Sequence, residues 1–184
     1  MLFRSAIARR SELSLHVFHD ERSAGFAALG IGRASGIPAV LLCTSGTAAA
    51  HFVAPVVEAH QSRVPMIVCT ADRPPELRDV AAPQTIDQTK MFGANVRWFH
   101  DPGVAADDAR HSWRSLARRA LAASVGTLPG PVQLNLPFRE PLLGEPGELP
   151  ASDGSRIVPA VLGIDPVTVN QVARRISEIG RAHV

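Results

Sequence analysis

Polar residues that follow apolar segments are the first candidates for chemistry in this sequence. Glu21 follows one such segment, Thr44 and Ser45 follow a second, and Arg73 follows a third, with Gln84 further along the same loop. The carboxyl ends of parallel strands meet at one edge of a sheet, and the loops there form a crevice. We therefore predict that a carboxylate, two hydroxyls, an amide and a guanidinium surround one binding crevice.

Local sequence leaves two interpretations of Glu21 open. In the first, Asp20 caps a helix and Glu21 lies in its first turn, where the helix dipole favours a carboxylate. In the second, the Glu21 side chain points into the crevice and does chemistry there.

The 44–47 turn also has two interpretations. It can present backbone N–H groups to an anion, or it can be a tight turn with Ser45 as a helix cap. It is not a nucleophile elbow, because no glycine precedes Ser45 at the required spacing. The glycines at 30 and 32 end a helix instead of following a strand, so they do not predict a dinucleotide site.

Arg73 is held between Asp72 and two prolines. A loop stiffened in this way can fix a guanidinium for bidentate binding of a carboxylate. The alternative is a surface arginine paired with Asp72 or Glu76. Gln84 is a possible polar contact in the same loop.

Hydrophobic periodicity predicts the elements that position these residues. Strands are expected at 13–18, 38–43, 64–69, 96–100 and 131–137, and helices at 21–34, 47–61, 113–121 and 165–180. Pro55 either kinks the second helix or lies in its first turn. Alternating strands and helices predict a doubly wound, mostly parallel α/β sheet with flanking helices. Its first strand is missing, since only a helical stub at 6–10 precedes residue 13.

The sequence divides into three parts. We predict an N-terminal domain over 6–142, a linker rich in Pro, Gly and Glu over 143–160, and the start of a second domain over 161–184. Residues 1–5 and 179–184 resemble translated sequencing adapters, so they are left out of the fold prediction.

Composition narrows the classes of function. The 184 residues are 46% hydrophobic and 20% charged, with a net charge of +2 and scattered arginines, which argues against nucleic-acid binding. No segment is long enough to span a membrane and no signal segment opens the chain, so we expect a soluble cytoplasmic protein. The two cysteines are expected as buried free thiols that each end a strand. The histidines show no metal-binding spacing, and we predict no metal ligands in this chain.

Six motifs, taken together, are more specific than any one of them. The region from about 15 to 142 resembles the pyrimidine-binding domain of thiamine diphosphate enzymes. The resemblance rests on DERSAGF at 20–26, TSGTA at 44–48, EAHQSRVP at 58–65, TADRPPEL at 70–77, QTIDQ at 84–88 and GPVQLN at 130–135.

This resemblance implies roles for the five residues. Glu21 would be the catalytic glutamate that hydrogen-bonds N1′ of the cofactor's aminopyrimidine, and Thr44 and Ser45 would lie beside the pyrimidine. Arg73 and Gln84 would bind substrate. Pro83 departs from the family pattern, which has asparagine there.

Within the family, the chain is similar to transferases of menaquinone biosynthesis. They decarboxylate 2-oxoglutarate and add the succinyl-semialdehyde carbanion to isochorismate. The resemblance implies a homo-oligomer, at least a dimer, when full length. It also implies Mg²⁺ with ligands outside this chain, because the Gly-Asp-Gly…Asn signature is absent, so the fragment alone would be inactive. The alternatives are a fragment of another carboligase such as acetohydroxyacid synthase, against which the 71–77 loop argues, and a non-catalytic domain that binds a small molecule.

Overall fold

Four parallel strands form the sheet of this protein. The computed structural model describes residues 6–142, 148, 151, 157–158 and 163–179. Within them the strand order is β1-β2-β4-β3, and every neighbouring pair is parallel. The predicted parallel α/β architecture is confirmed. The strands are β1 (Ala39–Cys43), β2 (Met66–Asp72), β3 (Trp98–His100) and β4 (Pro131–Pro137).

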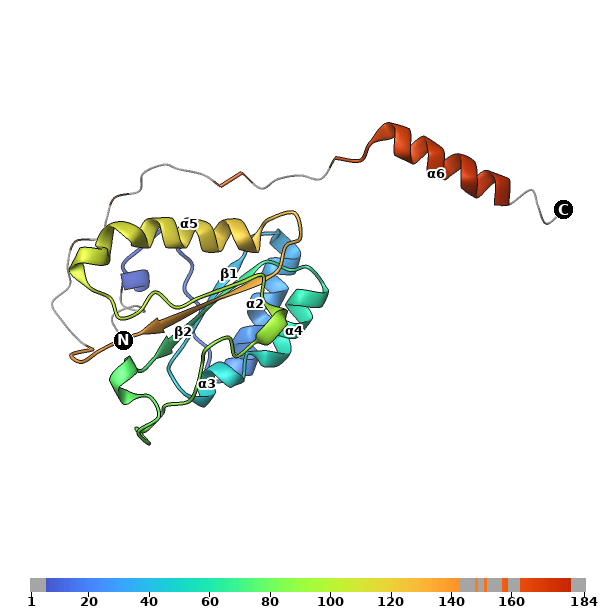
Figure 1. The fold of residues 1–184 in the computed structure, drawn as a ribbon. Helices are drawn as coiled ribbons and strands as arrows, with labels where there is room; N and C mark the ends of the chain where they lie inside the picture. Colours follow the sequence, from blue (N-terminus) through green and yellow to red (C-terminus); the bar gives the residue numbers. More distant parts are fainter. Residues whose placement is uncertain (1–5, 143–147, 149–150, 152–156, 159–162, 180–184) are drawn as a thin grey trace.

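Helices cover both faces of the sheet (Figure 1). α2 (Glu21–Ser35) and α4 (Val53–Gln61) pack on one face, and α5 (Trp113–Ser124) packs on the other. The remaining elements are α3 (Thr47–Ala50), α6 (Pro166–Ile179) and the 3₁₀ helices η1 (Pro75–Leu77), η2 (Gly93–Asn95) and η3 (Asp107–Ser112). A layer of helices on each face is the arrangement that parallel strands require.

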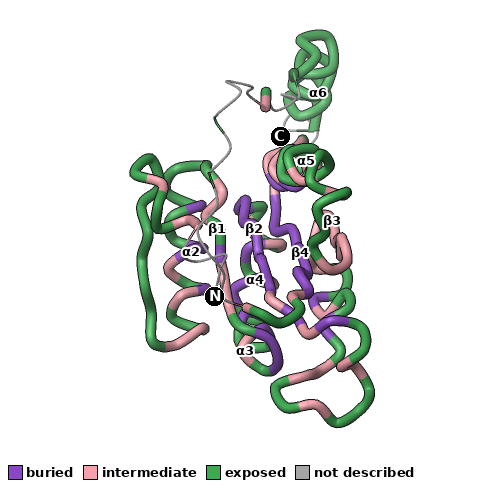
Figure 2. Tube along the Cα trace, turned by 90° about the vertical axis from the view of Figure 1, so that its left-hand side faces the viewer, coloured by how far each residue is buried: buried purple, intermediate pink, exposed green. Residues whose placement is uncertain are grey.

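The two central strands are the most deeply buried part of the molecule (Figure 2). Met66 and Val68 of β2 face α2 and α4, and Ile67 faces α5, because side chains alternate along a strand. Each face therefore has its own apolar core, and β2 contributes to both. This burial fixes the position of the carboxyl end of β2, which Arg73 directly follows.

The predicted 47–61 helix is two helices, and this corrects the sequence-based assignment. α3 ends at Ala50, and Pro55 lies in the first turn of α4, where its missing N–H is not needed. Pro55 also packs against α2: a Cβ at Gly25 would lie 2.4 Å from its Cγ. The helix therefore breaks before the proline. At Gly25, which has no side chain, α2 and α4 approach closely.

The predicted strand at 13–18 is wrong. Residues 14–18 have no regular secondary structure, and Leu13, Leu15 and Val17 are all exposed. A strand needs a hydrogen-bonding neighbour and a buried face. The described residues give this segment neither, so its apolar alternation does not produce a strand.

The C-terminal helix was predicted correctly. α6 spans Pro166–Ile179, and the side chain of Asp165 accepts hydrogen bonds from the N–H groups of Val167 and Thr168. All residues of α6 are exposed. Most of the proposed linker at 143–160, with residues 1–5 and 180–184, lies outside the described residues, so the domain boundaries stay a prediction.

Candidate functional site

The loops that follow β1 and β2 meet at one edge of the sheet. The amide nitrogen of Gln84 donates to Thr44 Oγ1 at 2.7 Å and to the carbonyl of Ser45 at 3.2 Å. Gln84 belongs to the loop that follows β2, whereas Thr44 and Ser45 directly follow β1. Three of the five predicted site residues are therefore in direct contact.

Glu21 is the first residue of α2. Asp20 is the helix cap, since its carboxylate accepts from the N–H of Ser23 at 2.9 Å, which confirms that part of the capping interpretation. Glu21 is half-buried. Burial raises the pKa of the Cys43 thiol to about 12, and the charge of Glu21 is the next contribution. Because Cys43 ends β1, the Glu21 carboxylate lies near the strand end that leads into the 44–46 turn.

The 44–46 turn has a backbone conformation that only glycine adopts without strain. Gly46 has φ 81° and ψ −146° and caps α3 without a side-chain hydrogen bond, so the interpretation of Ser45 as the cap is wrong. The Gly46 N–H donates to Gln88 Oε1 at 2.8 Å. This N–H is thus already bonded within the protein, and it does not support the anion-binding interpretation of the turn.

The Arg73 side chain does not form the pair with Asp72 or Glu76 that was the alternative to a binding role. Its backbone N–H donates to Asp72 Oδ1 at 2.7 Å, and its Nη2 donates weakly to the carbonyl of Pro83 at 3.4 Å. The Arg73 Nε is buried and has no hydrogen-bond partner among the described residues. The guanidinium therefore keeps a free donor beside the loop that carries Gln84.

Other arginines pair with the two carboxylates instead. Arg78 Nη2 lies 2.9 Å from Asp72 Oδ2 and 3.2 Å from Asp101 Oδ2. Arg139 forms a bidentate pair with Glu76, with its Nη2 2.9 Å from Oε2. The Arg139 side chain is the main reason that the pKa of Glu76 falls to about 2.

Sequence reasoning missed a group of buried polar residues beneath this edge. Asn135 donates to both Asp72 and Asp101, and Gln88 donates to Asn135. The signal for them was present: Gln133 and Asn135 interrupt an otherwise apolar strand, and buried amides need hydrogen-bonding partners.

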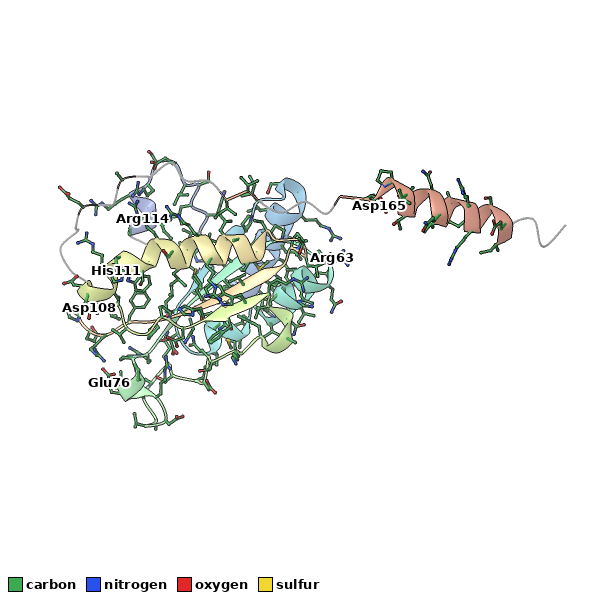
Figure 3. All side chains as sticks on the ribbon, turned by 45° about the horizontal axis from the view of Figure 1, so that its top comes forward. Arg63, Glu76, Asp108, His111, Arg114 and Asp165 are labelled. Carbon is green, nitrogen blue, oxygen red and sulfur yellow. The ribbon has the colours of Figure 1, made fainter. Side chains whose placement is uncertain are left out.

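A separate cavity of about 330 Å³ lies at the opposite end of the sheet. It is bounded by residues that end α2 and α4 and that precede β2, including Arg33 and Arg63. Figure 3 shows Arg63 and Glu76 on opposite sides of the domain. Arginines beside helix C-termini are favoured by the helix dipole, so this cavity needs no anionic ligand to explain its charges.

Two further properties concern the part of the chain that the structure describes. In that part, no three His, Cys, Asp or Glu side chains are grouped so that they could hold a metal ion. No helix there has both the length and the apolar character needed to cross a membrane.

Comparison with known proteins agrees with the parallel α/β fold. Residues 1–91 match the family described as thiamine pyrophosphate enzyme, N-terminal TPP binding domain. The same residues include α2, β1, β2 and the loop that carries Arg73 and Gln84. The chain belongs to this family.

Its relatives carry a more specific name. The chain is 51% identical over 146 residues to the 2-succinyl-5-enolpyruvyl-6-hydroxy-3-cyclohexene-1-carboxylate synthase of Chloroflexus aurantiacus, covering 79% of this chain and 25% of the relative. The synthases of the same name from Thermobifida fusca and Haloquadratum walsbyi are 52% and 43% identical, over 79% and 94% of this chain and 27% and 30% of their own lengths. The chain therefore spans about a quarter of the length of these curated relatives.

Proposed function

We propose that this chain is the N-terminal part of a thiamine diphosphate-dependent transferase of menaquinone biosynthesis. The enzyme would release CO₂ from 2-oxoglutarate and join the remaining four-carbon unit to isochorismate through a new carbon–carbon bond. The observation that carries the proposal is the contact of Gln84 with Thr44 and Ser45, near the strand end where Glu21 lies. The names of the relatives supply the substrate class.

The residues at this edge fit the pyrimidine half of the cofactor. When bound, thiamine diphosphate supplies the carbon that reacts with a 2-oxo acid. Glu21 would hold a proton at the pyrimidine N1′, because a half-buried carboxylate that opens a helix is a strong acceptor for a ring N–H. Thr44 and Ser45 would form the wall beside the ring, and the bond from Gln84 keeps that wall in place.

Arg73 and Gln84 would bind the substrates. Both substrates carry two carboxylates, and among the described residues the Arg73 guanidinium has only a weak hydrogen bond, from Nη2 to the carbonyl of Pro83. Arginine forms two parallel hydrogen bonds with a carboxylate, which fixes the orientation of the bound acid.

We assign the diphosphate and Mg²⁺ to parts of the longer protein outside this chain. The 184-residue chain would then be inactive alone. We further propose that the complete enzyme is cytoplasmic and acts as a homo-oligomer, at least a dimer.

The test is to express the complete enzyme from its genomic locus and to incubate it with thiamine diphosphate, Mg²⁺, 2-oxoglutarate and isochorismate. We expect both substrates to disappear together, with release of one CO₂ per product. The 184-residue chain is assayed in parallel and should show no turnover. Consumption of pyruvate in place of 2-oxoglutarate would support the acetohydroxyacid synthase alternative and overturn this proposal.

A further inference from the structure

Two buried side-chain amides connect the 44–46 turn to the start of the Arg73 loop. Gln88 is 1% exposed and Asn135 is fully buried. Gln88 accepts from the Gly46 N–H at 2.8 Å and donates to Asn135 Oδ1 at 3.0 Å. Asn135 in turn donates to Asp72 Oδ2 at 2.8 Å, and Asp72 Oδ1 accepts from the Arg73 N–H at 2.7 Å. We call Gln88 and Asn135 the amide relay.

The direction of every bond in the amide relay is fixed by its two ends. At one end, the Gly46 N–H can only donate, so the Gln88 oxygen must face it. At the other end, the carboxylates of Asp72 and Asp101 can only accept, so the Asn135 nitrogen must face them. Turning either amide over would bring donor against donor or acceptor against acceptor.

The remaining bonding capacity of the relay is also used. The Gln88 nitrogen donates to the carbonyl of Ala71 at 2.9 Å, and Asn135 Oδ1 accepts from the Thr70 hydroxyl at 2.9 Å. Both partners belong to β2. Because buried polar networks of this kind are stabilised only when all members are satisfied, loss of one amide disturbs the others.

We propose that Gln88 is a positioning residue that couples the 44–46 turn to the Arg73 loop through Asn135 and Asp72. The coupling itself follows from contacts within this chain. Its importance for catalysis rests on the proposed function, in which the turn faces the cofactor and Arg73 faces the substrate. Gln88 would thus hold the two halves of the site in register without touching either ligand.

Hydrogen exchange of the full 184-residue chain, followed by mass spectrometry in dilute solution, tests the coupling. In Q88L, we expect peptide amides at Gly46 and at Arg73 to exchange about tenfold faster relative to amides of β4. The Gly46 N–H loses its acceptor, and the Asp72 carboxylate that accepts from Arg73 is no longer held by an Asn135 that Gln88 fixes. The effect at Gly46 is direct, whereas the effect at Arg73 must pass through Asn135 and Asp72. Unchanged relative exchange at Arg73 would overturn the proposal.

Gln133 provides a matched control. It is also a fully buried glutamine, and its Nε2 donates at 3.0 Å to the backbone carbonyl of Gln88 and not to a side-chain amide of the relay. Q133L makes the same change of side chain and removes one buried hydrogen bond. We expect it to lower overall stability without changing the relative exchange at Gly46 and Arg73. The same exchange pattern in Q133L and Q88L would mean that Gln88 has only a packing role.

The isosteric Q88E variant keeps the proposal testable if Q88L does not fold, and it adds a pH-dependent readout. Its ionised carboxylate would face two acceptors, the Ala71 carbonyl and Asn135 Oδ1, whereas its protonated form can still bond Gly46 and donate once. Slow exchange at Gly46 and Arg73 should therefore return as the pH falls in Q88E and not in Q88L. The neighbouring charges of Asp72, Asp101 and Arg78 are common to both variants. A Q88E profile without this recovery would overturn the proposal.

Neither readout requires cofactor, substrate or turnover. A chain that shows the coupling but whose complete enzyme lacks transferase activity would refute the proposed function alone. An active complete enzyme without the coupling would refute the relay alone.

Discussion

Glu21 combines a position that stabilises a carboxylate with a place beside the predicted cofactor turn. It opens α2, where the helix dipole favours its charge. It also lies near Cys43, which immediately precedes Thr44. The capping interpretation and the catalytic interpretation are therefore compatible, because Asp20 caps the helix and leaves Glu21 free for another partner.

Replacement of Glu21 by glutamine tests its role in the complete enzyme. The two side chains have the same shape, so we expect an unchanged melting temperature but a rate of cofactor C2–H exchange that is lower by roughly 10²–10⁴-fold. The exchange is measured by NMR in deuterated buffer. Glu58→Gln is the control, since Glu58 is exposed on α4 and bonds Ser62. Equal exchange in the Glu21 variant and the control would remove Glu21 from the mechanism.

The Arg73 guanidinium is expected to act on substrate capture. Arg73→Ala in the complete enzyme should raise the KM for one or both substrates by roughly ten- to a hundredfold, the range for a lost charge-assisted hydrogen bond, with a smaller effect on kcat. Arg139→Ala is the control, because Arg139 is exposed and bonds Glu76 within the protein. A KM equal to that of the control would show that Arg73 is only a surface residue.

The two thiols should be unreactive in the folded chain. Burial is the main cause that raises the pKa of both Cys43 and Cys69 from 9.0 to about 12. A rise of this size lowers the thiolate fraction at neutral pH by about a thousandfold. Alkylation by iodoacetamide, followed by mass spectrometry, should be slow in buffer and fast in urea. Rapid modification in buffer would contradict the buried position of Cys69 and the half-buried position of Cys43.

Residue types revealed the candidate site, but not the contacts between its members. A carboxylate, hydroxyls, an arginine and a glutamine after apolar segments made Glu21, Thr44, Ser45, Arg73 and Gln84 candidates, and the resemblance to thiamine diphosphate enzymes implied their roles. The alternative pairing of Arg73 with Asp72 or Glu76 does not occur, because Arg78 and Arg139 bond these carboxylates instead. Arg139 is distant in sequence from Glu76, so local sequence does not show that this pair forms.

At the scale of elements, the 44–46 turn and the 83–85 segment interlock. Gly46 has a φ of 81°, and a Cβ there would lie 3.1 Å from the carbonyl oxygen of Gln84. Gln84 itself has a positive φ of 57°. The two segments therefore hold each other in backbone conformations that neither prefers alone.

Gly46→Ala tests this interlock. We expect a loss of about 1–3 kcal/mol in the free energy of unfolding, because alanine strains the backbone and contacts the Gln84 carbonyl. Gly36→Ala is the control: Gly36 has a φ of 69° but no atom within 4 Å of its Cβ position, so only the backbone cost of about 1 kcal/mol applies. Urea unfolding measures both values, and equal losses would mean that the turn and loop do not press on each other.

A pH-dependent ion pair connects the loops that follow β2 and β4. The pKa of Glu76 is lowered from 4.5 to about 2, chiefly by its hydrogen bond with Arg139. Since the folded-state pKa is depressed, the pair stabilises the folded chain fully above pH 4.5, and this contribution is lost as the pH falls from 4.5 toward 2. Both side chains are about half exposed, so the effect should be small.

Glu76→Gln checks this ion pair. We expect limited proteolysis of the loop that contains η1 to become faster in the variant at neutral pH, and the difference from the unchanged chain to vanish near pH 2. Proteolysis that is equally fast in both proteins at neutral pH would show that the pair does not restrain the loop. Glu58→Gln again serves as the control carboxylate.

Long periodic segments predicted the helices and strands well, whereas a segment without a neighbouring strand was wrongly predicted as a strand. α2, α5, β4 and α6 were anticipated within a few residues, because each helix has a clear apolar stripe and β4 is mostly apolar. The 13–18 segment has strand-like alternation but no neighbour in the described residues. Sequence shows the tendency to form a strand, but pairing is a property of the surrounding structure.

At the scale of the whole molecule, one side of the sheet exposes apolar surface. β1 is at the end of the strand order, so its outer edge has no strand partner among the described residues. Val40 of β1 is 54% exposed, and Phe26 and Ile31 of α2 are about half exposed. An unpaired edge beside exposed apolar side chains is a template for association with another chain.

We therefore expect the 184-residue chain to self-associate as its concentration rises, which sedimentation velocity measures directly. Val40→Lys should weaken this association by roughly tenfold, because a lysine on an edge strand opposes pairing and the apolar contact is lost. Leu128→Lys is the matched control, since Leu128 is 50% exposed and lies outside the strands. If both lysine variants associate as strongly as the unchanged chain, the β1 edge is not the contact. If both lysine variants weaken self-association equally, general charge repulsion explains the effect. A contact at the β1 edge would make Val40→Lys weaken self-association more than Leu128→Lys.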